Sequence, residues 1–237
     1  MKRKIQIGLL VCAVSFFFGC ETINSMLSGK SVFERYPPNA KKGWVEFYSG
    51  EKLFGTLNTD FVLKLAKIKD GIKTMIGRQT EAIAGMKPKF RTDELPGPMT
   101  YEIILDIGGP KSAVTTADVH IEEGMLQLVH LSSSIVGRES SGYLQEKLVY
   151  SLRATPGGSI PLARDAASLE KLVEAVDHPD WGTRWYAARA LEDMAGLMND
   201  DADQRLRERY GIESHPLVKE AIGQCRQKYH SYKMKNK

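Results

Sequence analysis

Three side chains near the middle of the chain are of types that bind metal ions. His120 and Glu122 lie two residues apart in a stretch with strand-like alternation, so both side chains face one side, and His130 follows. Imidazole nitrogens and a carboxylate are ordinary ligands of zinc. Surface polar positions on a sheet explain the three residues more simply, so we predict no metal site and no cofactor.

The other side chains with catalytic chemistry lack partners at a useful spacing. The serines at 132–134 and the segment 140–142 have no base beside them in sequence, and a mobile loop between strands is the plain interpretation. His178 and His215 each precede a proline where a helical pattern starts, which favours a role at the helix boundary. The chain has no G-x-S-x-G, G-x-G-x-x-G, Walker, H-E-x-x-H or C-x-x-C motif. We therefore predict that it is not an enzyme.

The first twenty residues predict a different chemistry, which is lipid attachment. Three basic residues at 2–4 precede an almost wholly apolar run at 5–18, and Gly19-Cys20 follows directly. This order is typical of an export signal. The apolar run is shorter than the roughly 20 residues that a spanning helix needs, so a permanent transmembrane helix is the weaker alternative.

The junction Phe17-Phe18-Gly19-Cys20 resembles the lipobox of bacterial lipoproteins. The resemblance implies that the signal peptide 1–19 is removed and that Cys20 carries acyl chains, such as palmitate, on its sulfur and its amine. It also implies a membrane anchor with the folded part in the periplasm. Because Glu21 replaces the aspartate that commonly retains such proteins at the inner membrane, we expect the outer membrane.

Net charge and cysteine content argue against a nucleic-acid partner and against an intramolecular disulfide. The formal charge of +4 includes three basic residues of the signal, so the mature chain keeps 30 basic against 29 acidic residues, or +1. A nearly neutral mature chain lacks the excess of positive charge that would attract a nucleic acid. With Cys12 removed and Cys20 acylated, only Cys225 remains, and an intramolecular disulfide cannot form.

Residues 20–40 are expected to be a linker, and residues 41–154 follow with a period of two, which predicts an antiparallel sheet. Gly and Pro mark the turns, as at 96–98. The expected strands cover residues 44–48, 61–68, 74–78, 99–107, 112–122, 124–131 and 145–153.

Three segments of this part resemble the PEGA-type β-sandwich modules of bacterial envelope proteins. They are residues 43–48, then Pro96-Gly97 leading into residues 100–103, then residues 119–124 with their V-x-I-x-x-G pattern. The resemblance implies a β-sandwich whose role is to bind or to space, and it brings no catalytic residue.

After a linker-like stretch at 155–161, the composition changes to Ala, Leu, Glu and Arg with a helical period. We expect a helical domain over residues 165–232. Its first helix would be capped by Ser168, and its second would run from Trp181 or Thr183 to about residue 197. A third would span 200–210 and end at Gly211, and a fourth would start at Pro216.

Two of these helices contain a repeat, because residues 183–191 and 218–225 lie 35 residues apart and each follows a His-Pro pair. The pattern resembles HEAT-like repeats, with small residues where packed helices approach. The fold class is therefore predicted as two-domain α+β, an antiparallel β-sandwich followed by a small HEAT-like array.

The candidate partner-binding residues are Trp181, Arg184 and Trp185. Two tryptophans four residues apart on one helix, with an arginine between them, could form an exposed patch for another protein. The alternative is that they pack on the β domain.

Together these features predict a lipid-anchored envelope protein that presents a protein-protein interaction surface. The rival hypothesis is a cell-wall or glycan-active enzyme with its site in a groove between the two domains. Groups with strongly shifted pKa values in such a groove would favour the enzyme.

Overall fold

The computed structural model of the chain describes residues 31–36, 41–49, 62–80, 87–106, 112–141 and 145–236. The expected signal peptide 1–19 and Cys20 lie outside the described residues. The described part is a mixed α+β structure with eight strands in two sheets and five helices. None of its helices is long and apolar enough to cross a membrane.

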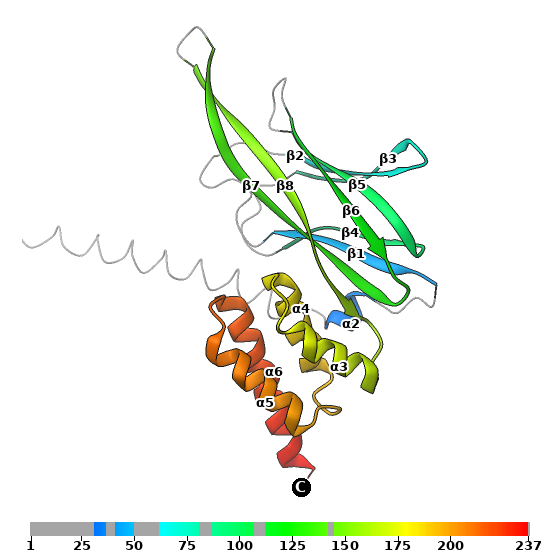
Figure 1. Cartoon of the computed structure of the whole chain (residues 1–237), viewed down its shortest axis with the longest axis vertical. Helices are drawn as coiled ribbons and strands as arrows, with labels where there is room; N and C mark the ends of the chain where they lie inside the picture. The colour runs from blue at the N-terminus through cyan, green and yellow to red at the C-terminus, as the bar shows by residue number, and fades with distance from the viewer. Residues whose placement is uncertain are drawn as a thin grey trace, which may run out of the picture. The chain divides into compact units, whose positions relative to one another are not determined.

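Each sheet has four strands (Figure 1). Sheet A has the order β4-β1-β7-β8, and sheet B has the order β3-β2-β5-β6. All neighbours are antiparallel except β1 and β7, which are parallel. The strands of sheet A are β1 (Gly43–Ser49), β4 (Lys87–Glu94), β7 (Met125–Ser141) and β8 (Gln145–Pro161). Those of sheet B are β2 (Val62–Lys69), β3 (Ile72–Thr80), β5 (Gly97–Asp106) and β6 (Ala113–Ile121).

The main hydrophobic cluster draws side chains from both sheets. Strand β5 contributes Tyr101, Ile103 and Leu105 at every second position, as the alternation predicts. Phe47 of β1 packs edge-on against Tyr101, with ring centroids 5.1 Å apart. The two sheets therefore share one core.

Strand β1 is buried on both faces. Val45 and Phe47 belong to the core between the sheets. Glu46 and Tyr48 point the other way and bond to residues at α4. Burial on two faces explains why nearly every residue of β1 is buried, polar Glu46 included.

The helices are α2 (Val32–Arg35), α3 (Ala166–Ala175), α4 (Trp181–Asp193), α5 (Asp200–Ile212) and α6 (Pro216–Lys235). Asp165, Asp180 and Asn199 cap α3, α4 and α5 by accepting a hydrogen bond from the backbone three residues on. The predicted cap Ser168 is instead the donor to Asp165, and Gly211 lies inside α5. Pro216 opens α6 as predicted.

Two stretches expected to be irregular are strands. The serines at 132–134 belong to β7, and the Pro- and Gly-rich stretch at 155–161 is the end of β8, paired with β7. The register shifts between Gln127 and Val129, and Pro156 lies beside this shift, where a proline is tolerated in a sheet. The expected linker at 155–161 is therefore wrong.

Part of the other expected linker, 20–40, is also folded. Ser31 and Glu34 form a capping box around α2, and Val32, Phe33 and Tyr36 are buried. Residues 31–36 thus belong to the packed structure.

Candidate functional site

Arg184 is buried, with a residue exposure of 7%, so the predicted exposed arginine is wrong. Its guanidinium donates two hydrogen bonds to the Glu213 carboxylate, from Nε at 2.8 Å and from Nη2 at 3.0 Å. Its Nη1 donates to the backbone oxygens of His178 and Pro179. Arg184 therefore ties together the two His-Pro segments that precede α4 and α6.

Glu213 is the acceptor for this pair and for a second arginine. Arg209 donates to Glu213 Oε2, and the backbone N–H of His215 donates to Oε1 at 2.9 Å. Burial opposes the charge, but the hydrogen bonds from Arg184, His215 and Arg209 prevail and lower the Glu213 pKa to about 2. The carboxylate is ionised at neutral pH.

The two tryptophans of the predicted patch pack inside the chain. Trp185 is buried and contacts the Tyr186 ring edge-on. Trp181 stacks on His215 at 4.0 Å and meets Tyr48 and His130 edge-on, so it lies against sheet A. Trp181 therefore packs on the β part, as the alternative has it, whereas the ring contact of Trp185 is with Tyr186 on its own helix.

Tyr48 joins sheet A to the start of α4 through Asp180. The Tyr48 hydroxyl lies 2.6 Å from both Asp180 oxygens, and Thr183 donates to Asp180 Oδ2 from its backbone and its hydroxyl. Burial would raise the Asp180 pKa, but hydrogen bonds from Tyr48 and Thr183 lower it overall. Burial and the Asp180 charge raise the pKa of Tyr48, which stays protonated and donates.

Glu46 is the second acidic group on this face of β1. Tyr186 of α4 donates to Glu46 Oε1, while Oε2 is buried with no hydrogen-bond partner among the described residues. Burial raises the Glu46 pKa to about 7, against the effects of Tyr186 and of Arg35 and Arg91. The two carboxyls on either side of Tyr48 thus have pKa values shifted in opposite directions.

Glycines allow α4 to approach sheet A this closely. A Cβ added to Gly182 would lie 2.3 Å from the Tyr48 ring, and one on Gly158 would lie 2.6 Å from Thr183. The Gly158 N–H also donates to the Thr183 hydroxyl at 2.9 Å. Gly158, in the stretch predicted to be a linker, and Gly182 on α4 therefore both allow the helix to pack closely on sheet A.

The three possible metal ligands do not come together in one site. His120 and Glu122 are exposed on and after β6, whereas His130 on β7 stacks on Tyr48 with centroids 5.1 Å apart. No three His, Cys, Asp or Glu side chains are placed to hold a metal ion in the part of the chain that the structure describes.

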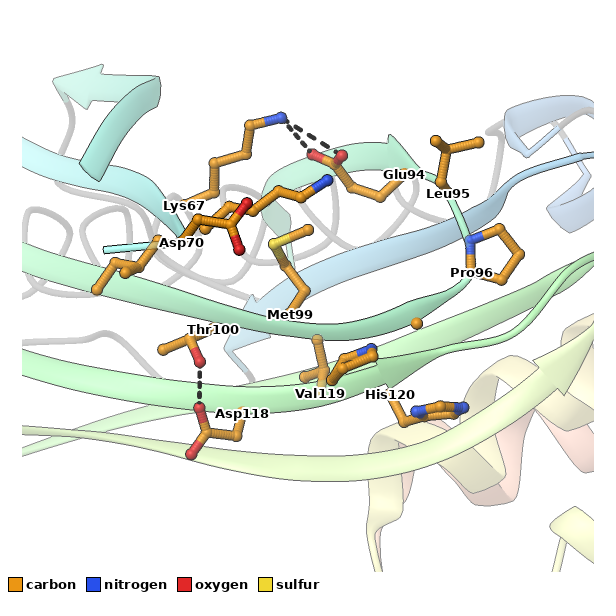
Figure 2. Close-up of a pocket in the computed structure, with 14 residues that line it drawn as sticks. Lys67, Asp70, Glu94, Leu95, Pro96, Met99, Thr100, Asp118, Val119 and His120 are labelled. Carbon is orange, nitrogen blue, oxygen red and sulfur yellow. Dashed lines mark hydrogen bonds and ion pairs between the residues drawn. The ribbon is translucent and has the colours of Figure 1, made fainter. Parts of the chain in front are cut away.

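A separate hollow of about 750 Å³ lies at one end of sheet B (Figure 2). Three segments line it: the β2–β3 turn, the β4–β5 turn and the end of β6. Its lining residues are Lys67, Ile68, Lys69, Asp70, Glu94, Leu95, Pro96, Gly97, Pro98, Met99, Thr100, Asp118, Val119 and His120.

The hollow combines apolar surface with polar groups, of which two pairs bond to each other. Lys67 Nζ lies 3.2 Å from Glu94 Oε1, and the Thr100 hydroxyl donates to Asp118 at 2.6 Å (Figure 2). Leu95 is 63% exposed, and Met99 is only partly buried. A surface of this kind suits an apolar group of a partner better than a reacting substrate.

Pro96-Gly97 predicts a turn, but no feature of the sequence alone assigns a role to Leu95. Gly97 has φ +134°, a backbone conformation that favours glycine, and Leu95 next to this turn is exposed. A leucine directly before a Pro-Gly turn was the available signal. The rest of the hollow depends on strand pairing that local spacing does not reveal.

No protein-family model matches the chain, and no curated protein matches it either.

Proposed function

We propose that the protein is a lipid-anchored protein of the cell envelope that binds another envelope protein and carries out no catalysis. The anchor is Cys20, which is lipidated on its sulfur, becomes the N-terminus when residues 1–19 are removed and is then acylated on its amine, and the folded part faces the periplasm from the outer membrane. The export signal and the Gly19-Cys20 junction support this location.

The proposed architecture is a PEGA-like β-sandwich followed by a HEAT-like helical unit. Two sheets with a shared core are consistent with the sandwich. Arg184 and Glu213 link the segments before α4 and α6, the two helices that carry the repeat, which is consistent with a repeated unit. Tyr48, Glu46 and Gly182 join the two parts tightly.

The observation that carries the binding function is the hollow beside Leu95. Leu95 and Ile72 are both accessible to a partner. Ile72 is 68% exposed and lies just after the β2–β3 turn that lines the hollow. Exposed apolar side chains around a hollow with a polar rim are typical of binding surfaces. The binding site is therefore assigned to this end of sheet B, away from Trp181, Arg184 and Trp185.

The rival enzyme hypothesis would need a reactive group that a substrate can reach between the sheets and the helices. Glu46 has the shifted pKa expected of such a group, yet it is fully buried beneath Tyr186. Burial behind a packed helix favours a structural role for this carboxyl.

Site-specific crosslinking in intact cells tests the binding function. A photo-crosslinking residue at Leu95 should capture a partner protein, and the same residue at Ile212, an exposed apolar position on α5, is the matched control. Leu95→Ser should abolish capture from a second crosslinker placed at Ile72, because Leu95 would lie in the contact. Equal yields from the positions 95 and 212, or capture unchanged by Leu95→Ser, would contradict the proposal.

A further inference from the structure

Glu46 is a buried carboxyl at the contact between sheet A and helix α4. It projects from β1, a strand with core residues on its other face, and its side chain has no exposed surface. Its single hydrogen bond from a described residue comes from Tyr186 on α4 to Oε1. The second oxygen is buried without a partner in the described part.

A carboxylate in this position is poorly compensated. One hydrogen bond replaces the several that water gives an ionised carboxylate, and no described residue forms an ion pair with Glu46. Arg91 is its cross-strand neighbour on β4, and Arg35 belongs to α2, so both cations act on Glu46 only through longer-range attraction. The neutral, protonated carboxyl fits this site far better than the ion.

The groups around Glu46 can be named on each element packed against it. They are Tyr48 on β1, His130 on β7, Arg91 on β4, Arg35 on α2, Tyr186 on α4 and Asp180 at the α4 cap. Tyr48 and Tyr186 keep their protons because burial and neighbouring carboxylates raise their pKa values. Asp180 ionises well below neutral pH. Glu46 is therefore the carboxyl of this contact that changes charge near neutrality.

We propose that Glu46 is a pH-sensitive latch, which holds α4 against sheet A while its carboxyl is protonated and loosens that contact when it ionises. Displacing α4 would let water reach the carboxylate, which the closed contact does not allow. Gly182 sits directly on the Tyr48 ring, so α4 and sheet A are in close contact next to Glu46 in the closed state. This latch is independent of the proposed binding function.

The contact has a second carboxyl with the opposite preference. The hydrogen bonds from Tyr48 and Thr183 favour the ionised form of Asp180, whereas burial favours the neutral form of Glu46. Both forms occur together between the lowered Asp180 pKa and the Glu46 pKa of about 7; acid neutralises Asp180, and a rise in pH through this range ionises Glu46. Opposite shifts in one contact give the latch its pH range.

Hydrogen exchange of the full-length chain in detergent micelles tests the latch. The amides of α4 are compared in the wild type and in Glu46→Gln at each pH, so that the pH dependence of intrinsic exchange cancels. A carboxyl that titrates at about 7 when closed and 4.5 when open should increase the relative opening of α4 by about 30-fold between pH 5.5 and 8.5. Glu122→Gln, which alters an exposed carboxyl, should behave as the wild type.

A second variant keeps the test decisive if Glu46→Gln folds poorly. Tyr186→Phe removes the hydrogen bond that favours the Glu46 carboxylate, so the pH midpoint of opening should move upward. A ratio between wild type and Glu46→Gln that does not change with pH, or an unmoved midpoint in Tyr186→Phe, would overturn the latch. So would an equal loss of protection in β7, because that result means global destabilisation instead of release of α4.

Discussion

At the scale of single residues, Arg184 shows how spacing along a helix carries more information than residue type. An arginine between two tryptophans suggests a surface patch, but Arg184 lies three residues before Ala187 and seven before Leu191, on the face that is buried. The charge is accommodated because Glu213, 29 residues later, meets the guanidinium with two oxygens.

Removing this arginine should be costly. Arg184→Ala leaves the Glu213 carboxylate buried with one arginine fewer, so we expect the free energy of unfolding to fall by about 3–5 kcal/mol in urea titrations. Arg205→Ala is the matched control, because its pair with Asp177 is exposed and should contribute about 1 kcal/mol or less. Similar losses in both variants would mean that the Arg184 pair is no more than a surface contact.

The same pair predicts how stability responds to acid. The Glu213 pKa is about 2 in the folded chain and has an ordinary value of 4.5. A lowered pKa in the folded state stabilises above pH 4.5, and this stabilisation is lost as the pH falls from 4.5 towards 2. Urea midpoints measured across this range should fall less steeply for Glu213→Gln than for the wild type. Parallel curves would show that Glu213 does not contribute to acid unfolding.

At the scale of the elements, the period of apolar residues predicted most strands and helices, and edge positions caused the failures. Strand β4 was not predicted because it has one core residue, Phe90, among charged residues and Pro88, a composition typical of an edge strand. The end of β8 was read as a linker for a related reason, since Pro156 lies beside an irregularity in register. Gly157 and Gly158 looked like linker residues, but their role depends on Thr183 and Asp180 of another element.

The hollow could not be predicted from the sequence, because strand pairing brings its residues together from distant parts of the chain. Lys67 and Glu94 are 27 residues apart and Thr100 and Asp118 are 18 apart, and only strand pairing brings each pair together. Local alternation predicts which face a residue occupies, but it does not predict which turn lies beside it. The turn next to Leu95 could therefore be predicted from the sequence, but the residues that surround Leu95 in the fold could not.

The packing of α4 on sheet A makes a prediction about Gly182. Gly182→Ala would place a Cβ 2.3 Å from the Tyr48 ring, so α4 must shift, and we expect a loss of about 1–3 kcal/mol in the free energy of unfolding. Gly211→Ala is the matched control in α5, where a Cβ meets nothing within 4 Å. It should stabilise by about 0.5–1 kcal/mol, because alanine favours a helix over glycine. If Gly182→Ala leaves the free energy of unfolding unchanged, α4 does not pack as closely on Tyr48 as described.

At the scale of the whole molecule, β1 couples the two halves of the fold. Phe47 belongs to the core between the sheets, while Glu46 and Tyr48 bond to residues of α4 and its cap. A change in the position of α4 therefore acts on a strand that also supports the core. The hollow lies at the end of sheet B, the sheet that shares this core with sheet A.

The proposed lipid anchor would determine where this molecule acts, and it can be tested directly. Cys20 lies outside the described residues, but the basic residues 2–4, the apolar run 5–18 and Gly19 together predict its acylation. Cells grown with a palmitate analogue should label the wild type and leave Cys20→Ser unlabelled, and Cys225→Ser should label as the wild type because that thiol is buried. Fractionation should then find the wild type in the membrane and Cys20→Ser released or unprocessed. Equal labelling of wild type and Cys20→Ser would remove the anchor, and with it the assignment of this protein to a membrane surface.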